Sequence, residues 1–286
     1  MLGRQRTGSV VCPSCGRLVG AAENRCPFCG RAAPAMWGFA PLLRRLGGGE
    51  QGLWPIVATS CVVLYVAMLA INPEGISTGG GIFGFLAPSN ASLLAFGASG
   101  AVPVLGRGHW WTLLSAGWLH GNLLHILFNL MWVRQLAPAV AHLYGPGRTL
   151  IIYTLSSVAG FLMSSLNVFM PGFVRTMLGG GQFTVGASAA LFGLLGALIH
   201  YSRRGGSKML GQQVWSWAIP LFIFGLIFPG VDNWAHLGGF AGGWLLSRWL
   251  DPMRPERVDH LIGGGLCLLA SAAAVVWSLL TALQIV

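Results

Sequence analysis

Three apolar stretches carry the polar side chains that decide how this chain is interpreted: HGNLLHILFN at 120–129, VGASAALFG at 185–193 and WAHLGGFAGG at 234–243. A charged or strongly polar side chain is costly inside a bilayer unless it faces a partner or a wet cavity. Each of these polar residues is therefore a candidate for function. A serine and a histidine together in such a setting indicate nucleophilic chemistry within the membrane. The candidates are His120, His125, Asn129, Ser188 and His236.

The composition indicates a membrane protein. Only 8% of the 286 residues are charged, whereas 54% are hydrophobic. Soluble domains carry about 25% charged residues. The 43 glycines suit close packing of helices in lipid, because small residues let backbones approach one another. We therefore expect an all-α polytopic membrane protein.

Apolar runs long enough to cross a bilayer predict seven spans. The fourth and fifth runs are short. Between the first two spans lies a Gly-rich loop whose apolar patches are too short to cross. We expect short interfacial helices there, with Trp110, Trp111 and Trp118 near the headgroups. The expected spans are 54–71, 123–143, 150–170, 185–201, 214–228, 233–250 and 261–283.

The distribution of basic residues predicts the orientation. If the N-terminus is cytoplasmic, every Lys and Arg except Arg107 and Arg175 falls on the cytoplasmic side. This asymmetry is typical of membrane proteins, and it places the C-terminus outside. The basic residues behind the net charge of +10 thus set the orientation of the chain in the membrane, and we expect no nucleic-acid partner. The strong excess of Arg over Lys favours a bacterial inner membrane.

Four cysteines near the N-terminus form two C-x2-C pairs: Cys12 with Cys15, and Cys26 with Cys29. Two such pairs offer the four tetrahedral sulfur ligands that a structural Zn²⁺ prefers. The alternative is two disulfides, which a reducing cytoplasm disfavours. We predict a zinc ribbon at 1–31 and a linker at 32–53. With its coordination sphere filled, the metal would be structural, and the ribbon would serve a protein partner.

The predicted topology brings the polar candidates together. The second, fourth and sixth spans all enter from the outer face, which places His125, Asn129, Ser188 and His236 at one depth. The short helix at 185–199 would begin below the outer surface, beside a water-filled cavity. Its N-terminus favours a developing anion next to Ser188. His125 and Asn129 are four residues apart, so both side chains can donate to one oxygen.

Helical spacing also predicts the packing around the candidates. Gly239 and Gly243 are four apart and form a smooth strip, which lets His236 reach Ser188. Phe192 lies four residues after Ser188, so its ring can pack beside the imidazole. The sequence therefore predicts contact between the fourth and sixth spans at the active serine.

Taken together, the three motifs resemble the rhomboid family of intramembrane serine proteases, over about residues 54–250. The resemblance implies a six-helix core at 54–250, with a linker and an added seventh transmembrane helix at 251–286. It implies a dyad without an acidic third member, which cleaves transmembrane segments of membrane proteins through an acyl-enzyme. The implied roles are Ser188 as nucleophile, His236 as base, His125 and Asn129 as oxyanion hole, and His120, Phe192, Gly186, Gly239 and Gly243 as supporting residues.

The chain departs from the family pattern in its first loop and beside the serine. Thr112 follows Trp111 in the first loop, where many relatives have arginine. Ala189 replaces a glycine after the serine, and Phe192 replaces a common tyrosine. Asp232 lies four residues before His236, and we expect it to be solvated in its loop rather than to orient the imidazole.

Two other functions remain open at this point. A non-catalytic relative would bind membrane helices for quality control, but such proteins lack the serine or the histidine, or have a residue that obstructs the nucleophile. A transporter or a ribbon that tethers nucleic acid is the other possibility. The topological role of the charges and the absence of basic–aromatic clusters in the ribbon disfavour it.

Overall fold

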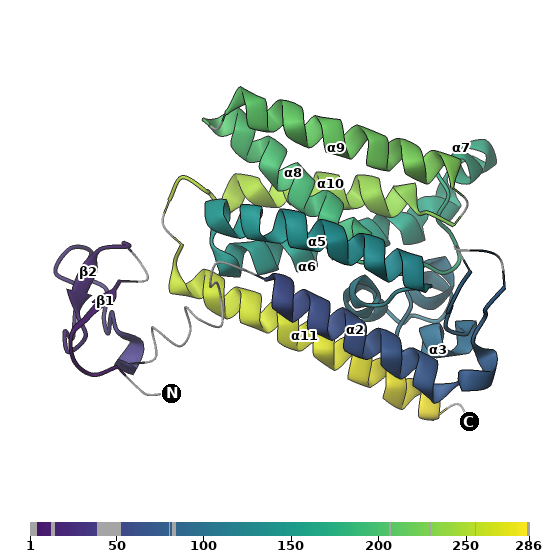
Figure 1. Ribbon diagram of the computed structural model, residues 1–286, viewed down its shortest axis with the longest axis horizontal. Helices are drawn as coiled ribbons and strands as arrows, with labels where there is room; N and C mark the ends of the chain where they lie inside the picture. The colour runs from purple at the N-terminus through teal and green to yellow at the C-terminus, as the bar shows by residue number, and fades with distance from the viewer. Residues whose placement is uncertain are drawn as a thin grey trace.

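The computed structural model describes residues 5–12, 15–38, 53–79, 81, 84–205, 207–228, 230–254 and 256–284. Within these ranges the chain forms a small two-stranded unit and a bundle of long helices (Figure 1). Most of the predicted linker at 32–53 lies outside the described residues.

The N-terminal unit is built around one short hairpin. Strand β1 (Ser9–Val11) pairs antiparallel with β2 (Leu18–Gly20), and Val10 lies opposite Val19. The short helix η1 (Met36–Gly38) follows. Both valines are buried with Cys12 and Cys26 in a small apolar cluster. A unit with so little apolar core needs an additional source of stability, such as a bound metal.

Among the described residues, seven long helices form the bundle, which confirms the expected all-α polytopic fold. Five of them, α2, α5, α6, α9 and α11, are long and apolar enough to cross a membrane. Helices α8 and α10 have 17 residues each. The helices are α2 (Trp54–Ile71), α5 (Leu123–Tyr144), α6 (Pro146–Leu166), α8 (Ser188–Arg204), α9 (Lys208–Ile227), α10 (Asn233–Trp249) and α11 (Val258–Leu283).

Three helices, α6, α9 and α11, begin earlier than the predicted spans at 150–170, 214–228 and 261–283. Helix α9 has 20 residues and begins at Lys208, so the expected short fifth span is wrong. The side chain of Ser207 caps it by accepting the Met209 N–H at 3.2 Å. Helix α6 begins at Pro146, a residue that suits the first turn because its missing N–H is not needed there.

Helix α8 occupies the centre of the bundle. It contacts α10, α6, α9 and α5, and its residues 189–200 are all buried. Glycines allow the close approach of α10. A Cβ at Gly239 would overlap the carbonyl oxygen of Ala189, and one at Gly243 would overlap that of Gly193. The predicted glycine strip therefore lies where α10 meets α8.

The loop between α2 and α5 contains short helices, but one of its tryptophans is not at the headgroups. Trp118 is buried and its ring lies 5.6 Å from that of Tyr153, so the expected interfacial position is wrong. Packing against α6 outweighs an interfacial site here. Trp110 remains 52% exposed. The described short elements of this loop are η2 (Pro73–Gly75), α3 (Asn90–Ala95), η4 (Val102–Gly106), α4 (Thr112–Ser115) and η5 (Ala116–Trp118). Two further short helices, η6 (Asn167–Phe169) and α7 (Gly172–Met177), lie between α6 and α8.

Candidate active site

The hydroxyl of Ser188 and the imidazole of His236 are in hydrogen-bond contact. Ser188 is the first residue of α8, and its Oγ lies 3.0 Å from Nε2 of His236 on α10. His236 is only 5% exposed. The contact joins two helices that are far apart in the sequence, and it is the geometry that an activated serine requires.

Asn233 is the third polar member of this group, and the sequence reasoning missed it. Its Oδ1 lies 2.9 Å from Nδ1 of His236, and its Nδ2 donates to the Phe222 carbonyl of α9 at 3.4 Å. Since the amide nitrogen faces Phe222, the oxygen faces His236, and Nδ1 must carry the ring proton. Nε2 is then free to accept the proton of Ser188. The available signal was an asparagine one helical turn before His236.

The ring of Phe192 stacks on the imidazole. The ring centroids of Phe192 and His236 are 4.2 Å apart with an interplanar angle of 14°. Phe192 lies one turn after Ser188 on the same buried helix. The stack restricts the imidazole to one plane without supplying a hydroxyl.

His125 lies against the turn that precedes the serine. Gly186 has a φ of +133°, and a Cβ at this position would lie 2.6 Å from Nε2 of His125. Asn129 donates one Nδ2 hydrogen to the His125 carbonyl at 2.9 Å. An amide group has a second N–H, which is still available to a ligand. The ring of the fully buried His120 packs edge-on against His125, with centroids 5.1 Å apart.

Asp232 caps α10 and does not contact the imidazole. Its carboxylate accepts the Ala235 N–H at 3.0 Å and the hydroxyl of Ser164. Burial raises the pKa of the Asp232 carboxyl. The expectation that Asp232 is solvated in a loop is therefore wrong, because the start of a buried helix needs an acceptor for its unpaired N–H groups.

The backbone before Ser188 is held by the loop between α2 and α5. Ser99 and Thr184 exchange two backbone hydrogen bonds, at 3.0 and 2.8 Å. The N–H of Gly186 donates to the Ala116 carbonyl at 3.0 Å. As the first residue of α8, Ser188 has a backbone N–H that the helix itself does not pair. Such an N–H can stabilise a developing oxyanion.

A cavity of about 750 Å³ opens onto these groups. Ser188, His236, His125 and Asn129 all line it, together with apolar side chains of α5 and α9 such as Phe128 and Phe224. The cavity is large enough for several residues of a peptide. It combines an apolar wall with a few convergent polar groups.

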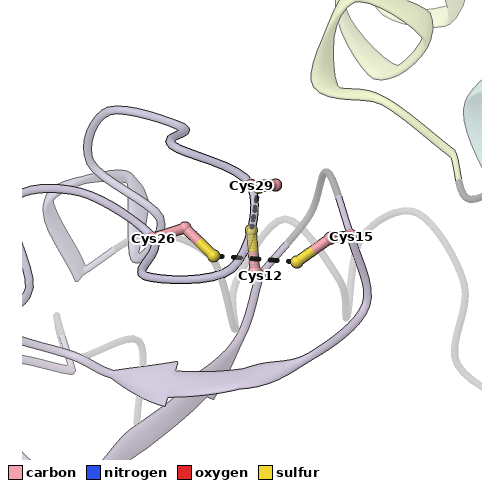
Figure 2. A group of neighbouring side chains, drawn as sticks. All are labelled: Cys12, Cys15, Cys26 and Cys29. Atoms are coloured by element: carbon pink, nitrogen blue, oxygen red, sulfur yellow. Dashed lines mark hydrogen bonds between the residues drawn. The ribbon is translucent and has the colours of Figure 1, made fainter.

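The four N-terminal cysteines converge on one point, as Figure 2 shows. Their sulfur atoms all lie within 4.8 Å of one another, with Cys12 and Cys29 at 3.8 Å and Cys15 and Cys26 at 3.6 Å. A tetrahedron with metal–sulfur bonds of about 2.3 Å has edges of about 3.8 Å. A disulfide requires about 2.05 Å, and all four cysteines are free. The group therefore fits a metal ion.

Each cysteine pair uses the same turn. The N–H of Gly16 donates to the Cys12 carbonyl and that of Gly30 to the Cys26 carbonyl, both at 2.9 Å. Both glycines have a φ of +72°, which side chains rarely adopt. A glycine after the second cysteine of each pair therefore allows the turn.

Known proteins match the bundle portion of the chain. A profile of the Rhomboid domain matches residues 107–251, about half of the chain. RHOMBOID-like protein 4 of Arabidopsis thaliana is 33% identical over 166 residues, covering 57% of this chain and 39% of the relative. Rhomboid protease GluP of Bacillus subtilis (strain 168) is 34% identical over 163 residues, covering 56% of this chain and 29% of the relative.

The chain thus spans less than half of the length of these two relatives. It covers more of the putative rhomboid protease YdcA of the same Bacillus subtilis strain. That protein is 31% identical over 155 residues, which are 53% of this chain and 72% of YdcA. The region matched by the profile contains Ser188, His236 and the two helices that carry them.

Proposed function

This chain belongs to the rhomboid family, and from that premise we propose that it is an intramembrane serine endopeptidase that cleaves transmembrane segments of membrane proteins. The observation that carries the proposal is the 3.0 Å contact between Ser188 Oγ and His236 Nε2. The bond from His236 to Asn233 supports it, because it leaves Nε2 free to act as a base.

In the proposed reaction, His236 accepts the proton of Ser188 while the serine oxygen attacks the carbonyl carbon of the scissile peptide bond. The resulting oxyanion accepts hydrogen bonds from the Ser188 N–H, His125 and Asn129. The protonated imidazole then gives its proton to the leaving amine, and an acyl-enzyme remains. A water molecule, deprotonated by His236, hydrolyses the ester and restores the serine.

The supporting residues fix this geometry. Phe192 holds the plane of the imidazole, and Gly186 lets His125 approach the nucleophile turn. His120 packs behind His125. Gly239 and Gly243 keep α10 against α8, so that the base reaches the serine.

We further propose the division of the chain into a ribbon at 1–31, a linker at 32–53, a protease core at 54–250 and an added linker and helix at 251–286. The four cysteines would hold a structural Zn²⁺, which cross-links the two turns and supplies no chemistry to the reaction. The ribbon would lie in the cytoplasm, where it meets a protein partner. The cavity would open to the outer face of a bacterial inner membrane, as the distribution of Arg and Lys indicates.

A fluorophosphonate probe tests the proposed function directly. We expect the probe to label the purified wild-type protein, not to label Ser188→Ala, and to label His236→Ala much more slowly. Cleavage of a transmembrane substrate in proteoliposomes should follow the same order, with the wild type fastest, His236→Ala much slower and Ser188→Ala inactive. Equal labelling of the wild type and Ser188→Ala would remove the assigned nucleophile. Binding of membrane helices without labelling or cleavage would instead favour a non-catalytic protein.

A further inference from the structure

The C-terminal part of α11 makes a specific contact with the loop between α2 and α5. The indole Nε1 of Trp111 donates to Ser278 Oγ at 3.0 Å, and the Ser278 hydroxyl donates to the Ala274 carbonyl at 2.9 Å. The ring of Trp277 lies edge-on to Trp111, with centroids 6.3 Å apart. Ser278 is 5% exposed, and this hydrogen bond is partly buried. A partly buried bond of this kind holds its partners more firmly than an exposed one.

The same serine also touches Gly97, at an earlier point in this loop. Gly97 has a φ of +98°, and a Cβ there would lie 2.5 Å from Ser278 Oγ. Ser115 Oγ donates to the Gly97 carbonyl at 2.7 Å. Ser278 therefore contacts both Trp111 and Gly97, near the two ends of the loop segment 97–116.

Segment 97–116 in turn holds the backbone before the nucleophile. It provides Ser99, which pairs with Thr184, and Ala116, whose carbonyl accepts the N–H of Gly186. Gly186 lies two residues before Ser188. A continuous series of contacts thus leads from α11 to the turn that presents the serine.

The opposite end of α11 is fixed to the start of α6. The Glu256 carboxylate accepts the backbone N–H of Arg148 at 2.7 Å, and Arg148 Nε donates to Nδ1 of His260 at 3.1 Å. Glycine packing adds to this contact, because a Cβ at Gly147 would lie 2.5 Å from the His260 carbonyl oxygen. With one end fixed, α11 gives the loop a firm point of attachment rather than a mobile one.

We propose that α11 is a positioning element for the active serine, and that Ser278 and Trp111 are the positioning residues through which it acts. This inference rests on the proposed function of Ser188. Neither residue lines the cavity at the dyad, so neither is expected to contact substrate. Their loss should loosen the turn before Ser188, and so lower turnover and leave substrate binding largely unchanged.

The variants Ser278→Ala and Trp111→Phe test this in the full-length protein in proteoliposomes. Each removes one side of the hydrogen bond and keeps most of the packing. Ser271→Ala is the matched control. Ser271 lies two turns earlier on the same helix and is also buried, but its hydroxyl has no partner among the described residues. Three quantities are measured: kcat and KM for a transmembrane substrate, the rate of fluorophosphonate labelling, and hydrogen exchange of the amides in 97–116 and 181–188.

We expect kcat and the labelling rate to fall about fivefold in Ser278→Ala and in Trp111→Phe, as for the loss of one buried hydrogen bond. KM should stay within about twofold of the wild-type value, as for a change that leaves substrate binding intact. The double variant should lose no more than the worse single variant, because both changes remove the same bond. Hydrogen exchange should rise in both loop segments for these variants, and not for Ser271→Ala.

Two results would overturn the inference. One is that Ser278→Ala matches Ser271→Ala in turnover, labelling and exchange. The other is that exchange rises in Ser278→Ala while kcat and labelling stay at the wild-type value. If the wild type itself is neither labelled nor active, the proposed function fails instead. In that case the exchange comparison still decides whether α11 holds the serine turn.

Discussion

Replacement of Asn233 should separate the orientation of the base from the packing of α9. Asn233 makes two contacts through one amide: its oxygen meets His236 Nδ1 at 2.9 Å, and its nitrogen donates to the Phe222 carbonyl at 3.4 Å. Asn233→Ala removes both contacts. Asn233→Asp keeps the oxygen toward His236 and loses the donor toward α9.

The expected loss can be calculated from the first contact. During the reaction the imidazole becomes a cation, and a hydrogen bond to a charged group contributes about 2 kcal/mol. A loss of about 2 kcal/mol in the transition state lowers the rate about 30-fold. The contact lies in a fully buried site, since Asn233 has no exposed surface, so water cannot readily replace the missing acceptor. We therefore expect kcat to fall about 30-fold in Asn233→Ala, with a much smaller fall in Asn233→Asp.

The assay is cleavage of a transmembrane substrate together with the rate of fluorophosphonate labelling. Ser247→Ala serves as the control for stability. Ser247 is buried on the same helix, where its hydroxyl donates to the Gly243 carbonyl at 2.7 Å, far from the dyad. If Asn233→Asp lost as much activity as Asn233→Ala, the contact with α9 would be responsible, and the assigned role of the oxygen would be refuted.

Three further predictions concern packing, pH and metal. Gly243→Ala should push α10 away from α8 and lower activity about 100-fold. Gly265→Ala should leave activity unchanged, because a Cβ at this position would meet nothing within 4 Å. Cleavage assays and thermal unfolding check both variants. Burial raises the pKa of Glu256 to about 7 in the folded protein, so folding favours the protonated carboxyl group. The free energy of unfolding should therefore fall as pH rises from about 4.5 to about 7. Glu256→Gln should flatten this dependence in thermal unfolding across that range. Metal analysis should find about one zinc per wild-type chain and little in the double variant Cys12→Ser and Cys15→Ser, as for a site that needs all four sulfurs; a folded, metal-free wild type would contradict the ribbon.

The sequence was informative where several constraints coincided. The contact between Ser188 and His236 was predictable because their expected order, depth and side of the membrane agreed, and because the glycine strip indicated how their helices approach. The cysteine spacing likewise predicted that four sulfur ligands meet at one site. Asn233 was missed although the predicted span already began at residue 233, because its amide is oriented by the Phe222 carbonyl of α9, a contact that only the tertiary structure shows. With Asp232 as the N-cap, Asn233 faces the imidazole and Asp232 faces Ser164.

Two other expectations were wrong because neither the apolarity of a run nor the type of a residue determines where a helix begins or which side chain is buried. Helix α9 continues through Gln212 and Gln213, where the apolar run stops, since a helix needs backbone hydrogen bonds and a cap rather than apolar side chains. Trp118 was assigned to the interface from its residue type. Only the tertiary structure shows that it packs against Tyr153.

The central position of α8 has a consequence for the way the protein meets different membranes. With 17 residues the helix is about 25 Å long, shorter than a hydrocarbon core of about 30 Å. A helix of that length facing lipid would thin the bilayer around it or tilt away. Because α5, α6, α9 and α10 surround α8, the lipid meets its neighbours instead, of which α5, α6 and α9 are longer, at 22, 21 and 20 residues. The depth of the serine is thereby set by protein contacts, and bilayers of different thickness can be accommodated by the peripheral helices alone.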